Sequence, residues 1–438
     1  MRFGTDGIRG RALDELTPEL AARIGRAAAR VLRGPRVLIG ADTRESGPQL
    51  VAALAAGIAA EGVDPEWLGV VPTPAVAHLC AVHGLPGAVV SASHNPWHDN
   101  GIKVFGPGGL KLNDADQAAL EAVIDSVDVP GALPAAPPAP AELTSEYVTH
   151  LIAALEGRSL AGQRVVLDCA NGAASELAPD VFRAAGAAVD AIHASPDGRN
   201  INAACGSTHL DAVARRVLET GAELGLAFDG DADRVLAVDH RGDVVDGDHL
   251  LAICATDLRS RGQLRRESVV ITVMTNLGFR LAMRDAGIDV IEVPVGDRHV
   301  LAALDEHGLS LGGEQSGHVI FRDLATTGDG LLTGLQLCSV VARSGVPLAE
   351  LASAAMTRLP QLLCNVAGTP DLVVALEPYV RAAAERLGDT GRVLVRASGT
   401  EPVVRLMVEA PTEEVAQATI DELVAASAGV GFAGESPS

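Results

Sequence analysis

Apolar positions along this chain recur in two alternating patterns, which together predict an α/β protein. Short runs of Val, Ile and Leu, as in PRVLIGAD and GAVVSAS, are typical of buried strands, and longer Ala-rich stretches, as in PQLVAALAAGIAAEG, predict helices between them. Strands that are apolar throughout fit largely parallel sheets covered by helices. We therefore expect three similar α/β domains with mixed, largely parallel sheets and a smaller C-terminal α+β domain.

The clearest linker is the Pro/Ala-rich segment VPGALPAAPPAPAELT, residues 129–144, which cannot form a regular element. It ends a first domain at residues 1–143. The rhythm of the later elements predicts further domains at residues 144–246, 247–358 and 359–438. The last domain is expected to contain strands at GRVLVRAS and PVVRLMVEA, with GVGFAGESPS as a disordered tail.

Three of the apolar strands run directly into loops rich in Gly, Ser or Asp, with one such loop in each α/β domain. They are GAVVSAS, LGLAFDG and LSLGGEQ. Ligands of open α/β sheets bind where strands end and loops begin. We expect these loops, with a fourth from the C-terminal domain, to line one central cleft.

The loop DGDADR offers three carboxylates at alternate positions, Asp229, Asp231 and Asp233. Such a turn can supply hard oxygen ligands to Mg²⁺ while leaving coordination positions for water and phosphate. The alternative is an Asx-rich turn with solvated carboxylates. In SASHNP, Ser93 could equally be a turn or helix cap, and no G-x-S-x-G pattern surrounds it. A serine, a carboxylate metal loop and surplus arginines together favour phosphoryl transfer.

Two further loops carry polar side chains beside glycines. In GGEQSGH, Glu314 and Ser316 can bond hydroxyl or amino groups, and His318 can move a proton near neutral pH. In RASGTEPVVR, a small turn lies between Arg396 and Arg405 and suits a phosphate dianion. Either loop could instead be a simple turn.

Composition narrows the possible partners. The net charge of −22 argues against nucleic acid and against an anionic membrane surface. Of 34 basic residues, 32 are Arg, and the two lysines are Lys103 and Lys111. The six cysteines contain no C-x-x-C pair, which indicates neither a zinc site nor a disulfide framework. Because no apolar run is long enough to span a bilayer, we expect a cytoplasmic protein.

In order and in content, the loops SASHNP, DGDADR, GGEQSGH and RASGTEPVVR resemble those of the α-D-phosphohexomutase superfamily, and they extend over the whole chain. Within it, FGTDGIRG, PDGRNINAACGSTH and Gln315 are most similar to the bacterial phosphoglucosamine mutase family. This resemblance implies interconversion of glucosamine 6-phosphate and glucosamine 1-phosphate, which supplies UDP-N-acetylglucosamine for cell-wall synthesis. It also implies Mg²⁺, a hexose 1,6-bisphosphate primer such as glucosamine 1,6-bisphosphate, and a monomer or homodimer.

The resemblance also assigns roles to individual residues. Ser93 would carry the phosphoryl group as phosphoserine. The ligands of Mg²⁺ would be Ser93, Asp229, Asp231 and Asp233. The sugar hydroxyls would be held by Glu314 and Ser316. The non-reacting phosphate would be held by Arg396, Ser398, Gly399, Thr400 and Arg405. Charge neutralisation or proton transfer at the reacting phosphoryl group would fall to Arg9, Lys103 and His318.

Three other functions compete with this interpretation. A phosphomannomutase/phosphoglucomutase would differ only in the sugar loop, where Gln315 argues against it. A metal-dependent sugar phosphatase would use the same serine and carboxylates, but it would not need the separate phosphate loop. A sugar-phosphate sensor would tolerate loss of Ser93 or of the aspartates, and all of these residues are present.

Overall fold

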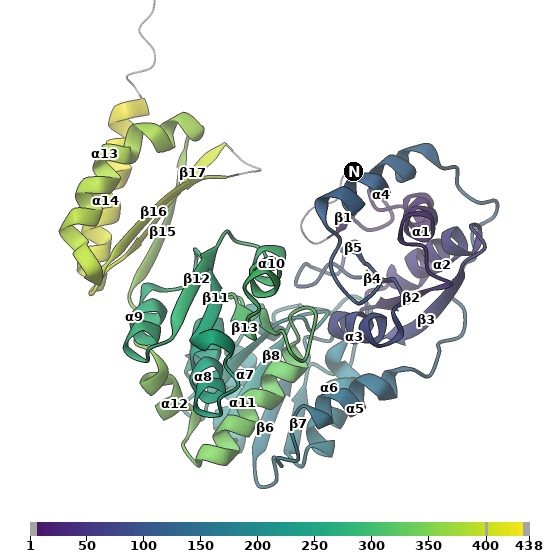
Figure 1. The fold of residues 1–438 in the computed structure, drawn as a ribbon, viewed down its shortest axis with the longest axis horizontal. Coiled ribbons are helices and arrows are strands. Elements are labelled where there is room, and N and C mark those ends of the chain that lie inside the picture. Colours follow the sequence, from purple (N-terminus) through teal and green to yellow (C-terminus); the bar gives the residue numbers. More distant parts are fainter. Residues whose placement is uncertain (1–6, 399–401, 432–438) are drawn as a thin grey trace, which may run out of the picture. The chain divides into compact units, whose positions relative to one another are not determined.

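The computed structural model describes residues 7–398 and 402–431, which divide into two compact units. Of the described residues, the first unit contains 7–274 and 287–355, and the second contains 275–286, 356–398 and 402–431. Figure 1 shows sheets accompanied by helices in each unit. The described residues form four sheets, which follow one another along the sequence.

The first sheet has the strand order β1-β5-β4-β2-β3. The pairs β4–β2 and β2–β3 are parallel, and β4–β5 and β1–β5 are antiparallel. Its elements are β1 (Ile8–Arg11), α1 (Pro18–Leu32), β2 (Arg36–Ala41), α2 (Gly47–Ala59), β3 (Asp64–Val70), α3 (Thr73–His83), β4 (Gly87–Val90), β5 (Asp99–Phe105) and α4 (Asp114–Ser126). Helices α1 and α2 pack closely because Gly57 has no β-carbon, which would lie only 2.0 Å from the Ala22 carbonyl oxygen.

The second sheet has the order β10-β9-β8-β6-β7, with parallel pairing of β6 to β7 and β8 and antiparallel pairing beyond β8. Its elements are α5 (Thr144–Ala153), β6 (Arg164–Asp168), α6 (Ala174–Ala184), β7 (Ala188–Ile192), the 3₁₀ helix η1 (Gly206–Thr208), α7 (Asp211–Thr220), β8 (Leu224–Phe228), β9 (Val235–Asp239) and β10 (Val244–Val245). Strands β6 and β8 are buried almost throughout, as parallel central strands require.

The third sheet has the order β12-β11-β13-β14 and completes the first unit. Its elements are α8 (Gly247–Ser260), the 3₁₀ helix η2 (Arg265–Glu267), β11 (Ser268–Thr272), β12 (Asp289–Val293), α10 (Asp297–His307), β13 (Leu311–Gly313), β14 (Val319–Phe321), α11 (Gly330–Ser344) and α12 (Leu348–Ala355). Helix α11 begins at a buried cap, where Asp329 accepts a hydrogen bond from the Leu332 N–H at 2.9 Å and one from the Tyr147 hydroxyl at 2.9 Å.

The second unit contains an antiparallel sheet of order β15-β17-β16 packed against helices. Its elements are α9 (Leu277–Asp285), β15 (Gln361–Ala367), α13 (Pro370–Leu387), the 3₁₀ helix η3 (Gly388–Thr390), β16 (Arg392–Ala397), β17 (Val403–Glu409) and α14 (Glu413–Gly431). Glu409 is fully buried there, and it accepts hydrogen bonds from Arg392 and Gln361 at 2.8 and 2.7 Å.

These sheets confirm the expected fold class of three similar α/β domains with mixed sheets and a smaller C-terminal α+β domain. Some local predictions were wrong. Strand β4 ends at Val90, so Ser91–Ser93 lie beyond it, and β1, β5 and β15 were not predicted. The predicted tail begins at Gly429, yet α14 continues to Gly431, and the rest of the tail lies outside the described residues.

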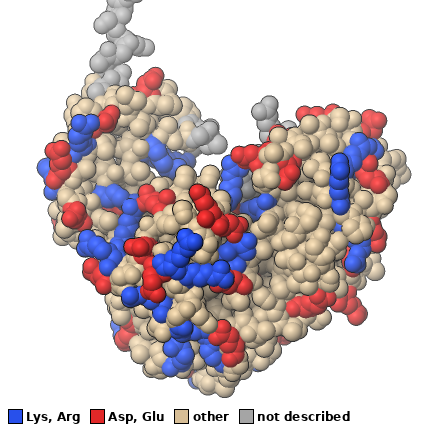
Figure 2. Space-filling view, in the orientation of Figure 1, with Lys and Arg blue, Asp and Glu red and all other residues tan. Residues whose placement is uncertain are grey.

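The surface of the described chain carries charges of both signs. Figure 2 shows Lys and Arg interspersed with Asp and Glu on the face in view. Among the described residues, no single helix is long and apolar enough to cross a membrane. Helices α11 and α12 are long and apolar enough only when taken together, and they form a bent pair. The cysteines within the described chain are all free thiols.

Candidate active site

Ser93 lies in the turn after β4 and has a strained backbone. Its φ angle is +53°, a region that non-glycine residues adopt rarely and at a cost of about 1–3 kcal/mol. The Ser93 N–H donates to Ser91 Oγ at 2.9 Å, and the Asn95 N–H donates to the Ala92 carbonyl at 3.1 Å. Because such a turn is unfavourable alone, the surrounding structure must hold it.

A buried ion pair behind the turn supplies part of that support. Arg44 Nε lies 2.9 Å from Asp42 Oδ2, and both side chains are fully buried. The guanidinium donates to the carbonyl oxygens of Ser93, Asn95 and Pro96 at 2.9, 2.9 and 2.5 Å. Burial raises the pKa of Asp42, although the charge of Arg44 opposes this effect. Arg44 thus holds the segment from Ser93 to Pro96 through three of its carbonyl oxygens.

The second sheet contributes further support to the same turn. Asn202 Nδ2 donates to the carbonyl oxygens of Ser93 and Asn95 at 2.8 and 3.0 Å. Gly230 approaches so closely that a β-carbon there would lie 2.5 Å from the Ser93 carbonyl oxygen. A glycine between the acidic residues therefore allows the serine turn and the acidic loop to meet.

The three aspartates follow β8 and converge on one point beside Ser93. One carboxylate oxygen from each of Asp229, Asp231 and Asp233 lies within 4.8 Å of the other two. The Ser93 hydroxyl donates to Asp229 Oδ2 at 2.5 Å. Asp229 and Asp231 are fully buried, and Asp233 is 5% exposed. The serine and the acidic loop therefore form one site within the first unit, as the sequence predicts.

Lys103 and Thr73 hold the carboxylates of this triad. Lys103 Nζ donates to Asp231 Oδ2 at 2.6 Å and to Asp233 Oδ2 at 3.0 Å. The Thr73 hydroxyl donates to the same Asp231 oxygen at 2.5 Å, and the Thr73 N–H donates to the Asp231 carbonyl at 2.9 Å. Helix α3 therefore begins at the acidic loop and orients one of its carboxylates.

The buried charges perturb one another. Burial raises the pKa of Asp229 well above its ordinary value, and the charges of Asp233 and Asp231 add to this. Burial acts on Asp233 in the same sense, but the Lys103 ammonium and the nearby His318 ring outweigh it and hold the pKa of Asp233 well below its usual range. A cation placed among the three carboxylates would relieve this repulsion.

The triad fits a hard divalent cation. The second oxygens of Asp231 and Asp233 are buried, and neither accepts a hydrogen bond from any residue that the structure describes. Carboxylate oxygens from one short loop suit Mg²⁺, which keeps positions for water and phosphate. The donor set is all oxygen, which does not favour a thiophilic metal.

The loop that follows β13 lies against the acidic loop. The Val235 N–H donates to the Gly317 carbonyl at 3.2 Å, and His318 Nδ1 lies 3.7 Å from Asp233 Oδ1. His318 Nε2 accepts a hydrogen bond from the Gly328 N–H at 3.1 Å, so the ring proton lies on Nδ1 and faces the carboxylate. Three predicted loops of the first unit therefore meet.

The two residues predicted to hold sugar hydroxyls lie in that same loop. Glu314 Oε1 accepts a hydrogen bond from the Gly296 N–H at 3.1 Å, which fixes the carboxylate. Ser316 Oγ is buried and makes no hydrogen bond within the described chain. A buried, unsatisfied hydroxyl beside an anchored carboxylate suits a polar ligand.

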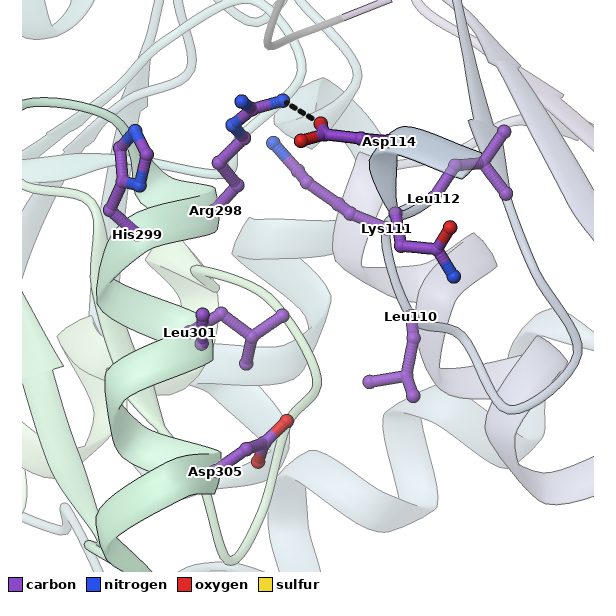
Figure 3. A pocket seen from close by; sticks show the side chains of 10 residues that line it. Leu110, Lys111, Leu112, Asp114, Arg298, His299, Leu301 and Asp305 are labelled. Atoms are coloured by element: carbon purple, nitrogen blue, oxygen red, sulfur yellow. Dashed lines mark hydrogen bonds and ion pairs between the residues drawn. The ribbon is translucent and has the colours of Figure 1, made fainter. Parts of the chain in front are cut away.

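A pocket of about 350 Å³ lies between the segment after β5 and helix α10. Figure 3 shows Lys111 and Arg298 extending into it, with Arg298 Nη1 3.1 Å from Asp114 Oδ1. Lys111 also pairs with Asp297, whose Oδ2 lies 3.5 Å from His318 Nε2. The pocket is thus linked to the site through Asp297, although the sequence-predicted site residues do not line it.

Arg9 lies on β1 directly opposite Gly101 of β5, two residues before Lys103. Burial lowers the pKa of His94, the residue after Ser93, and the charges of Arg234 and Arg9 lower it further. Arg9 therefore contributes positive charge beside the serine turn.

The predicted phosphate loop belongs to the second unit. Arg396 of β16 pairs directly with Arg405 of β17, and the Ser398 N–H donates to the Val403 carbonyl at 2.8 Å. Burial lowers the pKa of Arg396, and the charge of Arg405 lowers it further. Two opposed guanidinium groups favour an anion between them. Gly399 and Thr400 lie outside the described residues.

Sequence reasoning missed the residues that position the reacting groups: Asp42, Arg44, Thr73, Lys111 and Asn202. Arg44 and Asn202 reach the Ser93 turn from 49 and 109 residues away in the chain, and the side chains of this set are buried except that of Lys111, which is partly exposed. A signal was available, because Asp42 and Arg44 lie at the end of β2, as the predicted loops lie at the ends of their strands.

Comparisons with known proteins identify the family of the whole chain. Models of the phosphoglucomutase/phosphomannomutase family match alpha/beta/alpha domains I, II and III at residues 1–130, 145–242 and 246–359 and the C-terminal domain at residues 347–426. A phosphoglucosamine mutase of Frankia alni is 52% identical over 97% of this chain and 97% of its own length.

Solved structures show the same fold. A phosphoglucomutase/phosphomannomutase family protein from Burkholderia thailandensis superposes with a TM-score of 0.82 at 28% identity, covering 98% of this chain and 97% of its own. The N-acetylphosphoglucosamine mutase of Aspergillus fumigatus, solved with GlcNAc-6P and magnesium, superposes with a TM-score of 0.70 at 17% identity, covering 98% and 96%.

Proposed function

The chain belongs to the phosphoglucomutase/phosphomannomutase family, and on this basis we propose that it interconverts glucosamine 6-phosphate and glucosamine 1-phosphate. The sugar assignment is supported by the phosphoglucosamine mutase that is 52% identical over 97% of the chain. The observation that carries the chemistry is the Ser93 hydroxyl, 2.5 Å from a buried carboxylate of a three-aspartate site.

Ser93 carries the phosphoryl group. In the first transfer, the bond between phosphorus and Ser93 Oγ breaks, a bond to the free hydroxyl of the sugar phosphate forms, and that hydroxyl releases its proton. A bisphosphorylated sugar results. In the second transfer, Ser93 Oγ takes the phosphoryl group from the other end of the sugar, and the oxygen left there regains a proton. Arg9, Lys103 and His318 neutralise the charge of the transferred group and exchange these protons.

Asp229, Asp231 and Asp233 would hold Mg²⁺, together with an oxygen of phosphorylated Ser93. When bound, the ion supplies charge neutralisation at the phosphoryl group. The chain itself fixes the ligands, because Thr73 and Lys103 orient Asp231 and the peptide N–H of Arg234 donates to Asp229 Oδ1 at 3.2 Å.

The remaining loops grip the sugar and the phosphate that does not react. Glu314 and Ser316 bind sugar hydroxyls, and Arg396, Ser398, Gly399, Thr400 and Arg405 bind the phosphate. Because the intermediate must present each of its two ends to Ser93 in turn, the phosphate-binding residues have to recognise a phosphate dianion and not one end of the sugar. The opposed pair Arg396 and Arg405 has this property.

The proposal also includes the primer, the cellular location, the oligomeric state and the domain boundaries. A hexose 1,6-bisphosphate, such as glucosamine 1,6-bisphosphate, primes the serine. The enzyme acts in the cytoplasm as a monomer or homodimer, and its domain boundaries fall after residues 143, 246 and 358.

The test supplies Mg²⁺ and a catalytic amount of hexose 1,6-bisphosphate, then follows glucosamine, glucose and mannose 6-phosphates in parallel. We expect the highest kcat/KM with glucosamine 6-phosphate and no net release of phosphate. Preference for glucose or mannose phosphate would overturn the sugar assignment, and stoichiometric phosphate release would show a phosphatase.

A further inference from the structure

A second group of side chains with metal-ligating atoms lies in the second sheet's loops and has no part in the proposed chemistry. Asp168 ends β6, His193 follows β7, and Cys205 immediately precedes η1. Each therefore comes from a loop at the carboxyl end of the second sheet, where open α/β sheets bind ligands. One ligand atom from each lies within 4.8 Å of the other two.

The geometry of Asp168 is that of a fixed ligand. Its Oδ1 accepts a hydrogen bond from the Ala170 N–H at 2.9 Å, which leaves Oδ2 facing the other two side chains. Oδ2 lies 3.0 Å from His193 Nδ1, but neither atom forms a hydrogen bond of acceptable direction with any part of the described chain. Asp168 is fully buried, and a buried carboxylate calls for a cation, a place that the protonated His193 ring or a metal ion held by the same oxygen can fill.

The three side chains differ in their exposure to solvent. Cys205 is fully buried, whereas the His193 side chain is 32% exposed. An ion can therefore enter beside His193 and keep one position open to water.

We propose that Asp168, His193 and Cys205 form a binding site for a thiophilic divalent transition metal, with Zn²⁺ the preferred ion. Sulfur, imidazole nitrogen and carboxylate oxygen are the three ligand types of protein zinc sites, and three protein ligands plus water complete a tetrahedron. The all-oxygen triad of Asp229, Asp231 and Asp233 differs in softness, so the two sites select different ions.

The site is connected to the serine turn through a short path. The Asn202 N–H donates to the Ala170 carbonyl at 2.9 Å, and Asn202 lies three residues before Cys205. Its side chain in turn holds the carbonyls of Ser93 and Asn95. A metal ion bound by Asp168, His193 and Cys205 links the segment that contains Ala170 to the segment that contains Asn202. It therefore stabilises the position of Asn202, which holds the serine turn.

The test uses the full-length protein in buffer with excess Mg²⁺, titrated with Co²⁺ as a spectroscopic probe. We expect one equivalent to produce the near-ultraviolet thiolate-to-cobalt charge-transfer band and the visible bands of a tetrahedral ion. The Cys205→Ser variant should lose the charge-transfer band, and His193→Asn should weaken binding at least tenfold. Cys364→Ser, which alters a partly exposed thiol of the second unit, should behave as the wild type.

Zn²⁺ provides a second readout that does not depend on activity. It should raise the thermal midpoint of the wild type and of Cys364→Ser, and leave that of His193→Asn nearly unchanged. Because His193 is partly exposed, this variant keeps the comparison valid even when Cys205→Ser fails to fold. Absence of the charge-transfer band in the wild type, or a band that persists in Cys205→Ser, would overturn the proposal.

Discussion

Replacing Arg44 by Met tests whether the buried ion pair holds the serine turn. The change keeps most of the apolar volume but removes the cation 2.9 Å from Asp42 and the donors to the carbonyls of Ser93, Asn95 and Pro96. Removing one partner of a buried ion pair costs about 3–5 kcal/mol, because the other charge stays buried. Ser91 Oγ still donates to Asp42 at 2.5 Å, so we expect a loss of about 4 kcal/mol in the free energy of unfolding.

The assay is urea unfolding at pH 7.5, followed by circular dichroism, with turnover measured on the folded variant. The double variant Asp42→Asn with Arg44→Met removes the uncompensated carboxylate and should recover about half of the lost stability. Turnover of glucosamine 6-phosphate should stay low in both variants, because the carbonyls around Ser93 lose their donors in both. A loss of stability below about 1 kcal/mol in Arg44→Met would refute the reasoning.

Two further predictions concern single buried hydrogen bonds. Thr73→Val removes the hydroxyl that donates to Asp231 at 2.5 Å, so the Mg²⁺ concentration for half-maximal activity should rise about tenfold. Thr73→Ser keeps a hydroxyl and should stay near the wild-type value. Equal values in the two variants would contradict this role. Burial raises the pKa of Asp329 to about 6, so the folded state favours its protonated form and loses up to about 3 kcal/mol of stability as the pH rises from about 4 to 6. Asp329→Asn keeps the cap and the Tyr147 partner without this loss. The thermal midpoint of Asp329→Asn should therefore rise relative to that of the wild type across that pH range. A difference in midpoint that stays constant with pH would argue against the buried charge.

The grouping of the acidic residues could be predicted from sequence because they are contiguous. Asp229, Asp231 and Asp233 lie on one turn after β8, and their carboxylates are close together, as the alternate spacing predicts. The support of Ser93 could not be predicted in the same way. Arg44 and Asn202 come from segments far from Ser93 in the chain, and what joins them is tertiary packing. The same holds for the site at Asp168, His193 and Cys205.

The elements that sequence reasoning missed have a similar cause. Strand β5 contains Asp99, Asn100 and Gly101, residues that favour turns, yet β1 and β4 pair with it on both sides. Its strand conformation is imposed by its neighbours. Buried apolar runs such as β4 and β8 needed no such information, because their composition is sufficient.

The most direct test of the central claim is to locate the phosphoryl group. The wild type and Ser93→Ala are each incubated with Mg²⁺ and a hexose 1,6-bisphosphate, and peptide mass spectrometry then maps phosphorylation. We predict one phosphoryl group on the wild-type peptide that contains Ser93, and none on that peptide in Ser93→Ala, together with near-complete loss of turnover. A phosphoryl group on a different residue, or full turnover by Ser93→Ala, would contradict the proposed mechanism.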